Sequence, residues 1–133
     1  MQNEMIQKLV DTFPELFPKG SFWPECDDDW FEIIFAACQE LQTHHAELTA
    51  QAREETGYEE EVIRIDQIKE KFGSLRISLS WYSDLSQAIV SRAEDQSRTT
   101  CEACGQPGRI YSGGWISVAC ELHAPQKVNQ PDP

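Results

Sequence analysis

Apolar side chains recur at helical spacing in three stretches of the chain, which predicts three amphipathic helices. They are expected over residues 3–10, from near Asp29 to Gly57, and from Ser83 or Asp84 to about residue 98. The side chains expected to face the core are Met5, Ile6, Leu9 and Val10 in the first helix, Trp30, Ile34, Ala37, Cys38, Leu41 and Leu48 in the second, and Leu85, Ala88, Ile89 and Ala93 in the third.

The segment between the first two helices, residues 12–24, is rich in proline and aromatic residues. Large aromatic side chains gain free energy when they leave water, so we expect this loop to lie over the core. Its aromatic residues are Phe13, Phe17, Phe22 and Trp23.

Apolar and polar residues alternate over residues 61–72 and 75–82, which is typical of two antiparallel strands. The Gly-Ser dipeptide at 73–74 is expected to form a two-residue type II′ turn, which places Phe72 opposite Leu75. One face of this hairpin is then apolar, with Ile68, Phe72, Leu75, Ile77, Leu79 and Trp81, and the other is polar, with Lys69, Lys71, Arg76, Ser78 and Ser80.

Two features of the hairpin do not fit this alternation. Glu70 falls on the apolar face opposite Ile77, so its carboxylate needs a partner or the turn has a different length. Ile63 and Ile65 fall on the polar face, and a β-bulge near Asp66 would explain them. Helices and hairpin together predict an α+β fold, with helices packed on a small antiparallel sheet.

Four residues in the last third of the chain have the spacing of a zinc ligand set, C-x2-C, fifteen residues, then C-x2-H. Three thiolates and one imidazole make a closed tetrahedral shell, which is typical of one structural Zn²⁺ and leaves no position for water or substrate. Cys38 lies in an apolar helical run and is predicted to be a core residue. His44 and His45 are expected near a helix surface, without a second metal site. The predicted ligands are Cys101, Cys104, Cys120 and His123.

Glycines flank the first ligand pair at positions 105 and 108, where a turn around thiolates needs residues that tolerate positive φ. Residues 109–111 and 115–118 are expected to form two short strands around a Gly-Gly turn, which returns the second pair to the first. This layout predicts a zinc-ribbon or treble-clef-like module. A redox or disulfide pair is the alternative, but a thioredoxin-like C-x-x-C opens a helix, and Gly-Gln-Pro-Gly is a poor helix start.

The net charge of −12 is unevenly distributed along the chain. Residues 1–61 contain fifteen acidic and three basic residues, whereas residues 62–133 contain eight of each. The acidic half would repel nucleic acid and attract a basic protein surface. The alternative is a solvated face that only keeps the protein soluble. The acidic residues expected to bind a partner are Glu25, Asp27, Asp28, Asp29, Glu54, Glu55, Glu59, Glu60 and Glu61.

The length and the motifs of the chain limit its domain organisation, its location and its possible enzyme activity. The 133 residues are expected to divide into an acidic α+β domain over 1–100, a zinc module over 101–124 and a flexible tail over 125–133. No stretch has the pattern of a membrane span or a signal peptide, and cysteines at metal spacing indicate the reducing cytoplasm. The sequence has no nucleophile elbow, P-loop or H-E-x-x-H motif, so we expect no enzyme activity.

Residues 68–76, Ile-Lys-Glu-Lys-Phe-Gly-Ser-Leu-Arg, resemble the K-E-K-F-G-x-L-R signature of a family of small uncharacterised bacterial and bacteriophage proteins. Members of this family carry a later C-x-x-C-G-x-P-G…G-W…C-x-x-H segment. The resemblance covers roughly residues 27–124. It implies a metal site, and its link to bacteriophages favours a protein that antagonises a host system. The matching residues of the second segment are Cys101, Cys104, Gly105, Pro107, Gly108, Gly114, Trp115, Cys120 and His123.

The preferred hypothesis is a non-enzymatic, zinc-stapled acidic protein, encoded by a phage or mobile element, that inhibits or regulates a basic nucleic-acid-binding host protein. Mimicry of DNA by its acidic surface is the sharpest form of this hypothesis. The alternative is a zinc-ribbon nucleic-acid-binding or regulatory module, in which Lys69, Lys71 and Arg76 form a basic stripe. So few phosphate contacts would give weak binding. The stripe could equally pair with the acidic run at 59–61 within the same chain.

Overall fold

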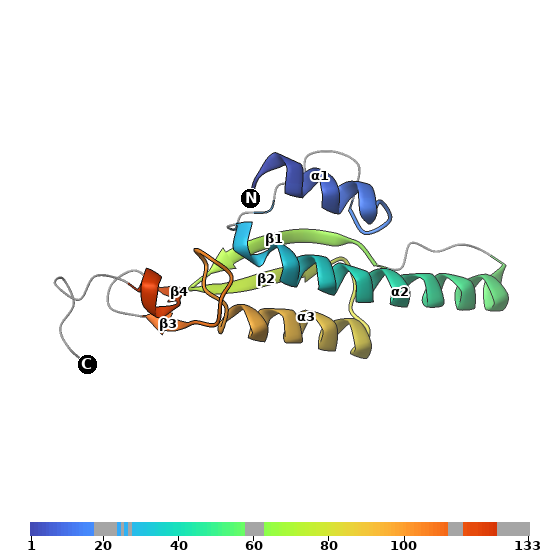
Figure 1. The fold of residues 1–133 in the computed structure, drawn as a ribbon. Helices are drawn as coiled ribbons and strands as arrows, with labels where there is room; N and C mark the ends of the chain where they lie inside the picture. Colours follow the sequence, from blue (N-terminus) through green and yellow to red (C-terminus); the bar gives the residue numbers. More distant parts are fainter. Residues whose placement is uncertain (18–23, 25, 27, 58–62, 112–115, 125–133) are drawn as a thin grey trace.

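The structure, a computed structural model, describes residues 1–17, 24, 26, 28–57, 63–111 and 116–124. The fold is α+β, as the sequence predicts, and contains two separate two-stranded antiparallel sheets (Figure 1). Its elements are α1 (Asn3–Thr12), the 3-10 turn η1 (Asp28–Trp30), α2 (Phe31–Thr56), β1 (Ile65–Lys71), β2 (Ser74–Leu79), α3 (Asp84–Ser97), β3 (Arg109–Tyr111), β4 (Ser117–Ala119) and the 3-10 turn η2 (Glu121–His123).

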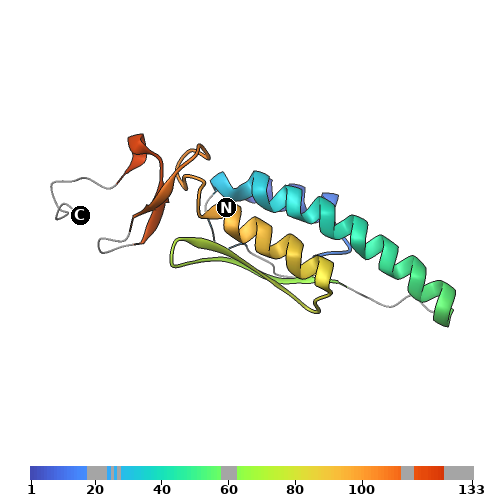
Figure 2. The ribbon, with the colours of Figure 1, turned by 90° about the horizontal axis from the view of Figure 1, so that it is seen from below.

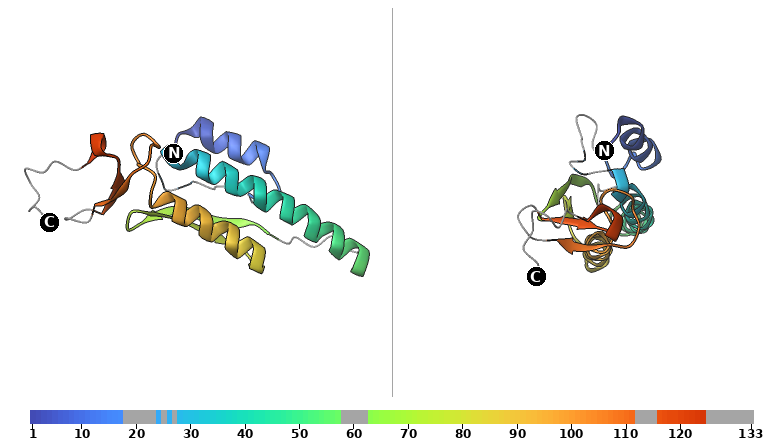
Figure 3. Two further views of the ribbon diagram at one scale, coloured as in Figure 1. Left: turned by 60° about the horizontal axis from the view of Figure 1, so that its bottom comes forward. Right: turned by 60° about the vertical axis from the view of Figure 1, so that its left-hand side comes forward.

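The three helices and the first hairpin form a layered body. Helices α2 and α3 lie side by side over one face of the β1–β2 hairpin (Figure 2). Helix α1 lies on the far side of α2 (Figure 3), where Lys8 Nζ is 5.6 Å from the centre of the Phe31 ring and 5.3 Å from that of Phe35. The β3–β4 hairpin lies at the end of the body where α2 begins. The C-terminal end of α2 projects beyond the other elements at the opposite end (Figure 1).

The core lies between the helices and the inner face of the hairpin. Phe13 and Phe17 are buried, which confirms that this part of the loop covers the core, whereas Phe22 and Trp23 lie outside the described residues. The largest fully buried side chains are Leu9, Leu16, Trp30, Ile34, Cys38, Leu41, Ile63, Ile65, Ile68, Leu75, Val90 and Val118.

The helix predictions are largely confirmed. Helix α2 ends at Gly57, whose φ of 78° is left-handed, and Ser83 caps α3 by accepting the Ser86 amide. The inward residues predicted for α3 are only half right, because Leu85 and Ala88 are exposed. With Ser83 as the N-cap, the side of α3 that contains Ser86 is buried. The buried residues of α3 are Ser86, Ile89, Val90, Ala93 and Ser97.

The turn of the first hairpin differs from the prediction by one residue. Lys71 pairs with Ser74, so the two turn residues are Phe72 and Gly73, not Gly73 and Ser74. Both have positive φ, 53° and 79°, as a type I′ turn requires. Phe72 is therefore not on the apolar face, and its side chain is 69% exposed. Trp81, predicted on the same face, lies beyond the end of β2 and is 48% exposed.

The two irregular features of the hairpin are explained. The ladder shifts by one residue between Ile65 and Gln67, which confirms the predicted bulge near Asp66 and places Ile65 in the core. Glu70 pairs with Leu75 instead of Ile77, at the tip end of the inner face. Its carboxylate accepts the Gly73 amide at 2.8 Å, so it has the partner that its position demands.

Side chains of α3 accept hydrogen bonds from amides on the outer edge of β2. The Leu75 amide donates to Ser97 Oγ at 2.9 Å, and the Ile77 amide donates to Glu94 Oε2 at 3.0 Å. Unpaired strand amides are a template for aggregation, and these contacts satisfy them. They also fix α3 to the hairpin, so the end of α3 has a defined position when it leads into the metal-ligand segment.

Several sequence predictions fall on residues that the structure does not describe. They are the Gly-Gly turn at 113–114, the first residue of the fourth strand at 115 and the tail at 125–133. In the described part of the chain, no helix combines the length and the apolar character that a bilayer crossing demands.

Candidate metal centre

The first ligand pair lies in a tight loop that follows α3. The Cys101 amide donates to the Gln106 carbonyl at 2.7 Å, and the Gly105 amide donates to the Cys101 carbonyl at 2.9 Å. Gly105 has a φ of 75°, which a side chain would disfavour. The positive φ predicted for the two flanking glycines is therefore confirmed at Gly105 and wrong at Gly108.

The second pair arrives through the β3–β4 hairpin. In this ladder Arg109 pairs with Ala119, and a Cβ at Gly108 would lie 2.7 Å from the Ala119 carbonyl group. Glu102 joins the two halves of the module. Its amide donates to the Val118 carbonyl at 2.9 Å, and its carboxylate accepts the Val118 amide at 3.1 Å. Cys120 then follows β4, and His123 ends the 3-10 turn η2.

The four predicted ligands converge in space. All their ligand atoms lie within 4.8 Å of one another. The closest described separations are 3.7 Å between Cys104 Sγ and Cys120 Sγ, 3.8 Å between Cys101 Sγ and His123 Nδ1, and 3.1 Å between Cys120 Sγ and His123 Nδ1. A tetrahedral ion with metal–sulfur bonds of about 2.3 Å needs ligand separations of about 3.5–3.8 Å. The cluster therefore has the size of a four-coordinate metal site.

No disulfide joins the clustered sulfur atoms in this conformation. All five cysteines are free thiols. The 3.7 Å between Cys104 Sγ and Cys120 Sγ is far longer than the about 2.05 Å of a disulfide bond. Cys26 and Cys38 are buried away from the cluster, and burial raises the pKa of the Cys38 thiol to about 12. Cys38 is therefore an inert core residue, as predicted.

The ligands influence one another even without an ion. The hydrogen bond with the His123 imidazole lowers the pKa of the Cys120 thiol to about 6. The amide of Gln106 lowers the pKa of Cys104, but desolvation together with the thiols of Cys101 and Cys120 raises it overall. Metal binding requires deprotonated sulfur, so Cys120 offers a ready thiolate at neutral pH.

Comparisons with known proteins add no identification. No protein-family model matches the chain, and no curated protein or solved structure shows significant similarity to it.

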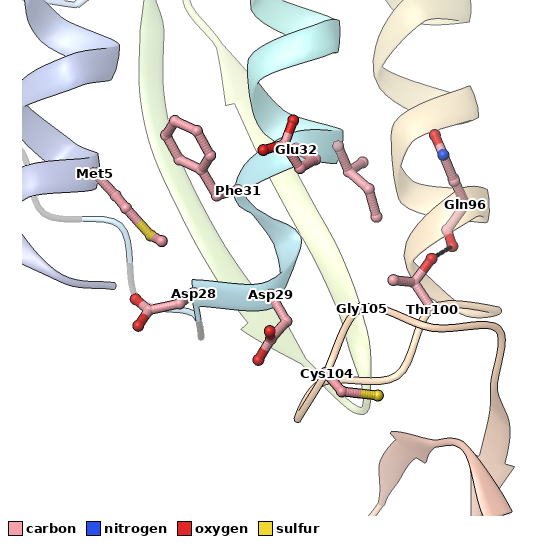
Figure 4. Close-up of a pocket in the computed structure, with 10 residues that line it drawn as sticks. Met5, Asp28, Asp29, Phe31, Glu32, Gln96, Thr100, Cys104 and Gly105 are labelled. Carbon is pink, nitrogen blue, oxygen red and sulfur yellow. Dashed lines mark hydrogen bonds between the residues drawn. The ribbon is translucent and has the colours of Figure 1, made fainter.

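A hollow of about 440 Å³ opens beside the ligand cluster (Figure 4). It lies between α1, η1, the start of α2, the end of α3 and the loop that holds Cys104. Its walls combine carboxylates, from η1 and the first turn of α2, with the apolar surface of Met5 and Phe31. No lining residue among those described is a lysine or arginine. We call this hollow the acidic cleft, and it is lined by Met5, Asp28, Asp29, Phe31, Glu32, Ile33, Gln96, Thr100, Cys104 and Gly105.

An adjoining hollow of about 410 Å³ shares Asp28 and Asp29 and adds Glu102, which lies between the first two metal ligands. Some of these carboxylates stabilise the fold. Asp28 Oδ1 accepts the Gln2 amide at 2.7 Å, and carboxylates at the start of α2 interact favourably with the helix dipole. Glu32 is close to Asp28 in the sequence, whereas Glu102 comes near Asp28 only in the folded chain, so no local pattern links these two.

The predicted acidic residues that the structure describes lie in two separate clusters. Asp28 and Asp29 lie before the start of α2, whereas Glu54 and Glu55 lie in its last turn. Helix α2 has 26 residues and is therefore about 39 Å long. These two clusters do not form one patch. The other predicted acidic residues, Glu25, Asp27, Glu59, Glu60 and Glu61, lie outside the described residues.

The alternative basic stripe lies on the outer face of the β1–β2 hairpin. Lys69 is directly opposite Arg76, and Lys71 lies two residues further on the same face. Arg76 Nη1 is 3.9 Å from Glu94 Oε1. Among the described residues, Lys69 and Lys71 have no acidic partner. The three basic residues therefore share one face of the hairpin.

The tip of this hairpin contacts the segment of residues 101–124 that holds the ligand cluster, which we call the metal module. A Cβ at Gly73 would lie 2.9 Å from Ile116 Cγ2, at the start of β4. Gly73 is therefore required both by its φ of 79° and by this close approach. The hairpin motif and the cysteine-histidine motif, which are far apart in the sequence, are in direct contact.

The prediction that His44 and His45 lie near a helix surface is wrong. Both are buried, with 9% and 6% exposure. His44 Nε2 is 2.7 Å from Ser83 Oγ, and His45 accepts the Ile63 amide at 3.3 Å. A serine beside a histidine is a possible nucleophile and base. Ser83 Oγ also accepts the Ser86 amide as the cap of α3, so this hydroxyl links the start of α3 to α2.

Proposed function

We propose that this protein is a non-enzymatic interaction module, stapled by one structural Zn²⁺, whose acidic cleft binds a basic segment of a partner protein. The partner class that best matches this chemistry is a protein with a basic nucleic-acid-binding surface. Occupation of that surface by the module would inhibit or regulate the partner.

The observation that carries this proposal is the composition of the acidic cleft. Three carboxylate side chains line one hollow that has no lysine or arginine in its described lining, and Met5 and Phe31 provide apolar surface beside them. An arginine or lysine side chain matches both features, because its aliphatic stem packs on apolar groups while its charge remains near carboxylates. The proposal rests on this cleft and not on a continuous acidic face, because α2 separates Asp28 from Glu54.

The choice of zinc follows from the ligand chemistry. Three sulfur atoms and one imidazole nitrogen are preferred by Zn²⁺, whereas Mg²⁺ and Ca²⁺ prefer oxygen ligands. Four protein ligands complete a tetrahedral shell, so the ion would stabilise the module without binding substrate. Because Cys104 and the neighbouring Gly105 also line the acidic cleft, the ion would fix one wall of the proposed binding site.

The test is the binding of a defined basic peptide to the zinc-loaded protein. A fluorescent arginine-rich peptide should bind in a salt-sensitive manner, and a peptide with neutral citrulline at each arginine position should not. The variant Asp28→Asn/Glu32→Gln preserves side-chain size and the acceptor for Gln2. It should bind the arginine peptide about tenfold more weakly, because both carboxylate charges are lost.

The matched control is Glu47→Gln/Glu54→Gln, which removes the same charge from an exposed part of α2 far from the cleft. It should bind the arginine peptide almost as the parent protein does. Equal weakening by both double variants would show that binding depends on net charge alone, and the proposed site would be wrong. A partner captured from a lysate should show the same difference between the two variants.

A further inference from the structure

The tip of the β1–β2 hairpin carries an aromatic side chain under unfavourable conditions. Phe72 is 69% exposed to solvent and has a φ of 53°. Type I′ turns favour asparagine or glycine at this position, because a bulky side chain with positive φ is strained. Both the exposure of the ring and the strain of its backbone destabilise the folded chain. Since phenylalanine does not stabilise the hairpin at this position, the ring is expected to contact something outside the chain.

The surroundings of Phe72 define the chemistry of that contact. Lys71 Nζ lies 5.6 Å from the centre of the Phe72 ring, and Lys69 follows on the same strand. Neither lysine has an acidic partner among the described residues. The neighbouring carboxylate of Glu70 accepts the Gly73 amide. The tip therefore presents one ring and two cations, and it would fit a hollow with an apolar wall and carboxylates.

The acidic cleft has this composition. Met5, Phe31 and Ile33 supply apolar surface, and Asp28 and Glu32 supply carboxylates. Its volume of about 440 Å³ exceeds that of a phenylalanine side chain. The charges of tip and cleft are opposite, so attraction between two copies of the chain is expected where each brings its tip to the other's cleft.

Tip and cleft also lie at the same end of the molecule. Gly73 in the tip approaches Ile116 of the metal module, and Cys104 and Gly105 of that module line the cleft. Two copies that meet through their metal ends could therefore exchange both contacts at once. Such an exchange is an isologous interface, the commonest arrangement in homodimers, and it closes without forming a filament.

We propose that the acidic cleft binds the Lys71–Phe72 tip of a second copy of this chain, which forms a two-fold symmetric dimer. The inference names one occupant for the cleft of the proposed function and rests on that cleft. Each interface contains two small contacts, so the dimer is expected to be weak, salt-sensitive and populated only at raised protein concentration.

The test exchanges one charge on each side of the contact. Lys71→Glu places a carboxylate at the tip, and Glu32→Lys places an ammonium in the cleft. Each variant alone should dimerise far more weakly than the parent, because Lys71→Glu places a carboxylate opposite the carboxylates of the cleft and Glu32→Lys places an ammonium opposite Lys71. An equimolar mixture should form a heterodimer, because the altered tip meets the altered cleft and the native tip meets the native cleft. Analytical ultracentrifugation with one labelled variant measures this directly.

Two controls separate the specific contact from general charge effects and from misfolding. Arg53→Glu and Glu47→Lys exchange the same charges on the far part of α2, and each should dimerise as the parent does. Phe72→Asn removes the ring but supplies a residue that a type I′ turn prefers. This variant should therefore unfold at a higher temperature than the parent and yet remain monomeric.

Monomeric parent protein at every concentration, or failure of the Lys71→Glu and Glu32→Lys mixture to associate, would overturn the inference. Dimerisation of Phe72→Asn would also overturn it. These outcomes are distinguishable from failure of the proposed function. If the parent protein binds the arginine peptide but does not dimerise, only the second copy as occupant is excluded. If it does neither, the acidic cleft is not a binding site for cations.

Discussion

At the scale of single residues, Gly73 is the position where two demands of the fold coincide. Its φ of 79° is one that other residues adopt only with strain, and its missing side chain leaves room for Ile116 Cγ2. Gly57 has almost the same backbone, with a φ of 78°, but a Cβ there would meet nothing within 4 Å. The two glycines therefore allow backbone strain to be measured separately from steric contact.

We predict that Gly57→Ala lowers the free energy of unfolding by about 1 kcal/mol, the cost of a left-handed alanine. Gly73→Ala should lower it by about 2–4 kcal/mol, because overpacking against Ile116 adds to the same strain. Urea titrations of the metal-loaded protein measure both values. Adding Ile116→Ala to Gly73→Ala should recover the steric part. Equal effects of the two glycine substitutions would show that the hairpin tip does not press on the metal module.

At the scale of secondary-structure elements, the start of α3 connects three parts of the fold. Ser83 Oγ accepts the Ser86 amide at 3.0 Å, and Ser86 Oγ accepts the Ser83 amide at 2.8 Å. The His44 imidazole of α2 lies 2.7 Å from Ser83 Oγ. A single hydroxyl therefore caps α3 and holds α3 against α2, while α3 in turn closes the edge of β2.

Ser83→Ala should lower the free energy of unfolding by about 1–2 kcal/mol, since the helix loses its cap and His44 loses its partner. Thermal denaturation followed by circular dichroism is the appropriate measurement. Ser91→Ala, on the same helix, is the control and should change stability by less than about 0.5 kcal/mol. A Ser83→Ala protein as stable as this control would mean that the cap contributes nothing in solution.

The elements show what the sequence could and could not predict. Helical spacing located all three helices, and the misplaced isoleucines correctly predicted the bulge beside Ile65. The turn was missed because Gly73 fits either position of a two-residue loop. The choice depends on Glu70, which must reach the Gly73 amide, and on a positive φ at Phe72 that no local pattern indicates.

Of the two candidate sites, one could be predicted from the sequence and the other could not. The cluster of three cysteines and one histidine was predictable because C-x2-C and C-x2-H spacings reflect local loop geometry. The acidic cleft was not, because its walls come from α1, η1, α2, α3 and the Cys104 loop, which only the fold brings together. Counting acidic residues selected Asp28 and Glu54 as partner-binding candidates but left open whether they share one face, and a helix of about 39 Å separates them.

At the scale of the whole molecule, the metal module packs directly against the helices and the first hairpin. Ile116 contacts the tip of the first hairpin, and Gly105 lies against η1, where a Cβ would be 3.7 Å from the Asp29 carbonyl oxygen. One side of the module thus supports the Phe72 tip, and another side forms a wall of the acidic cleft. Loss of the ion should therefore disturb both surfaces at once.

Metal removal gives the corresponding prediction. The protein should contain one zinc ion per chain, and Cys120→Ser should lose it, whereas Cys26→Ser, which changes a thiol outside the cluster, should retain it. On chelation, amide hydrogen exchange should accelerate in the module and at residues 72–75, because the tip loses its contact with Ile116. Exchange in α1, which lies on the far side of α2, should change little. Unchanged protection at residues 72–75 would show that the tip keeps its position without the metal, and the proposed dimer would then not depend on zinc.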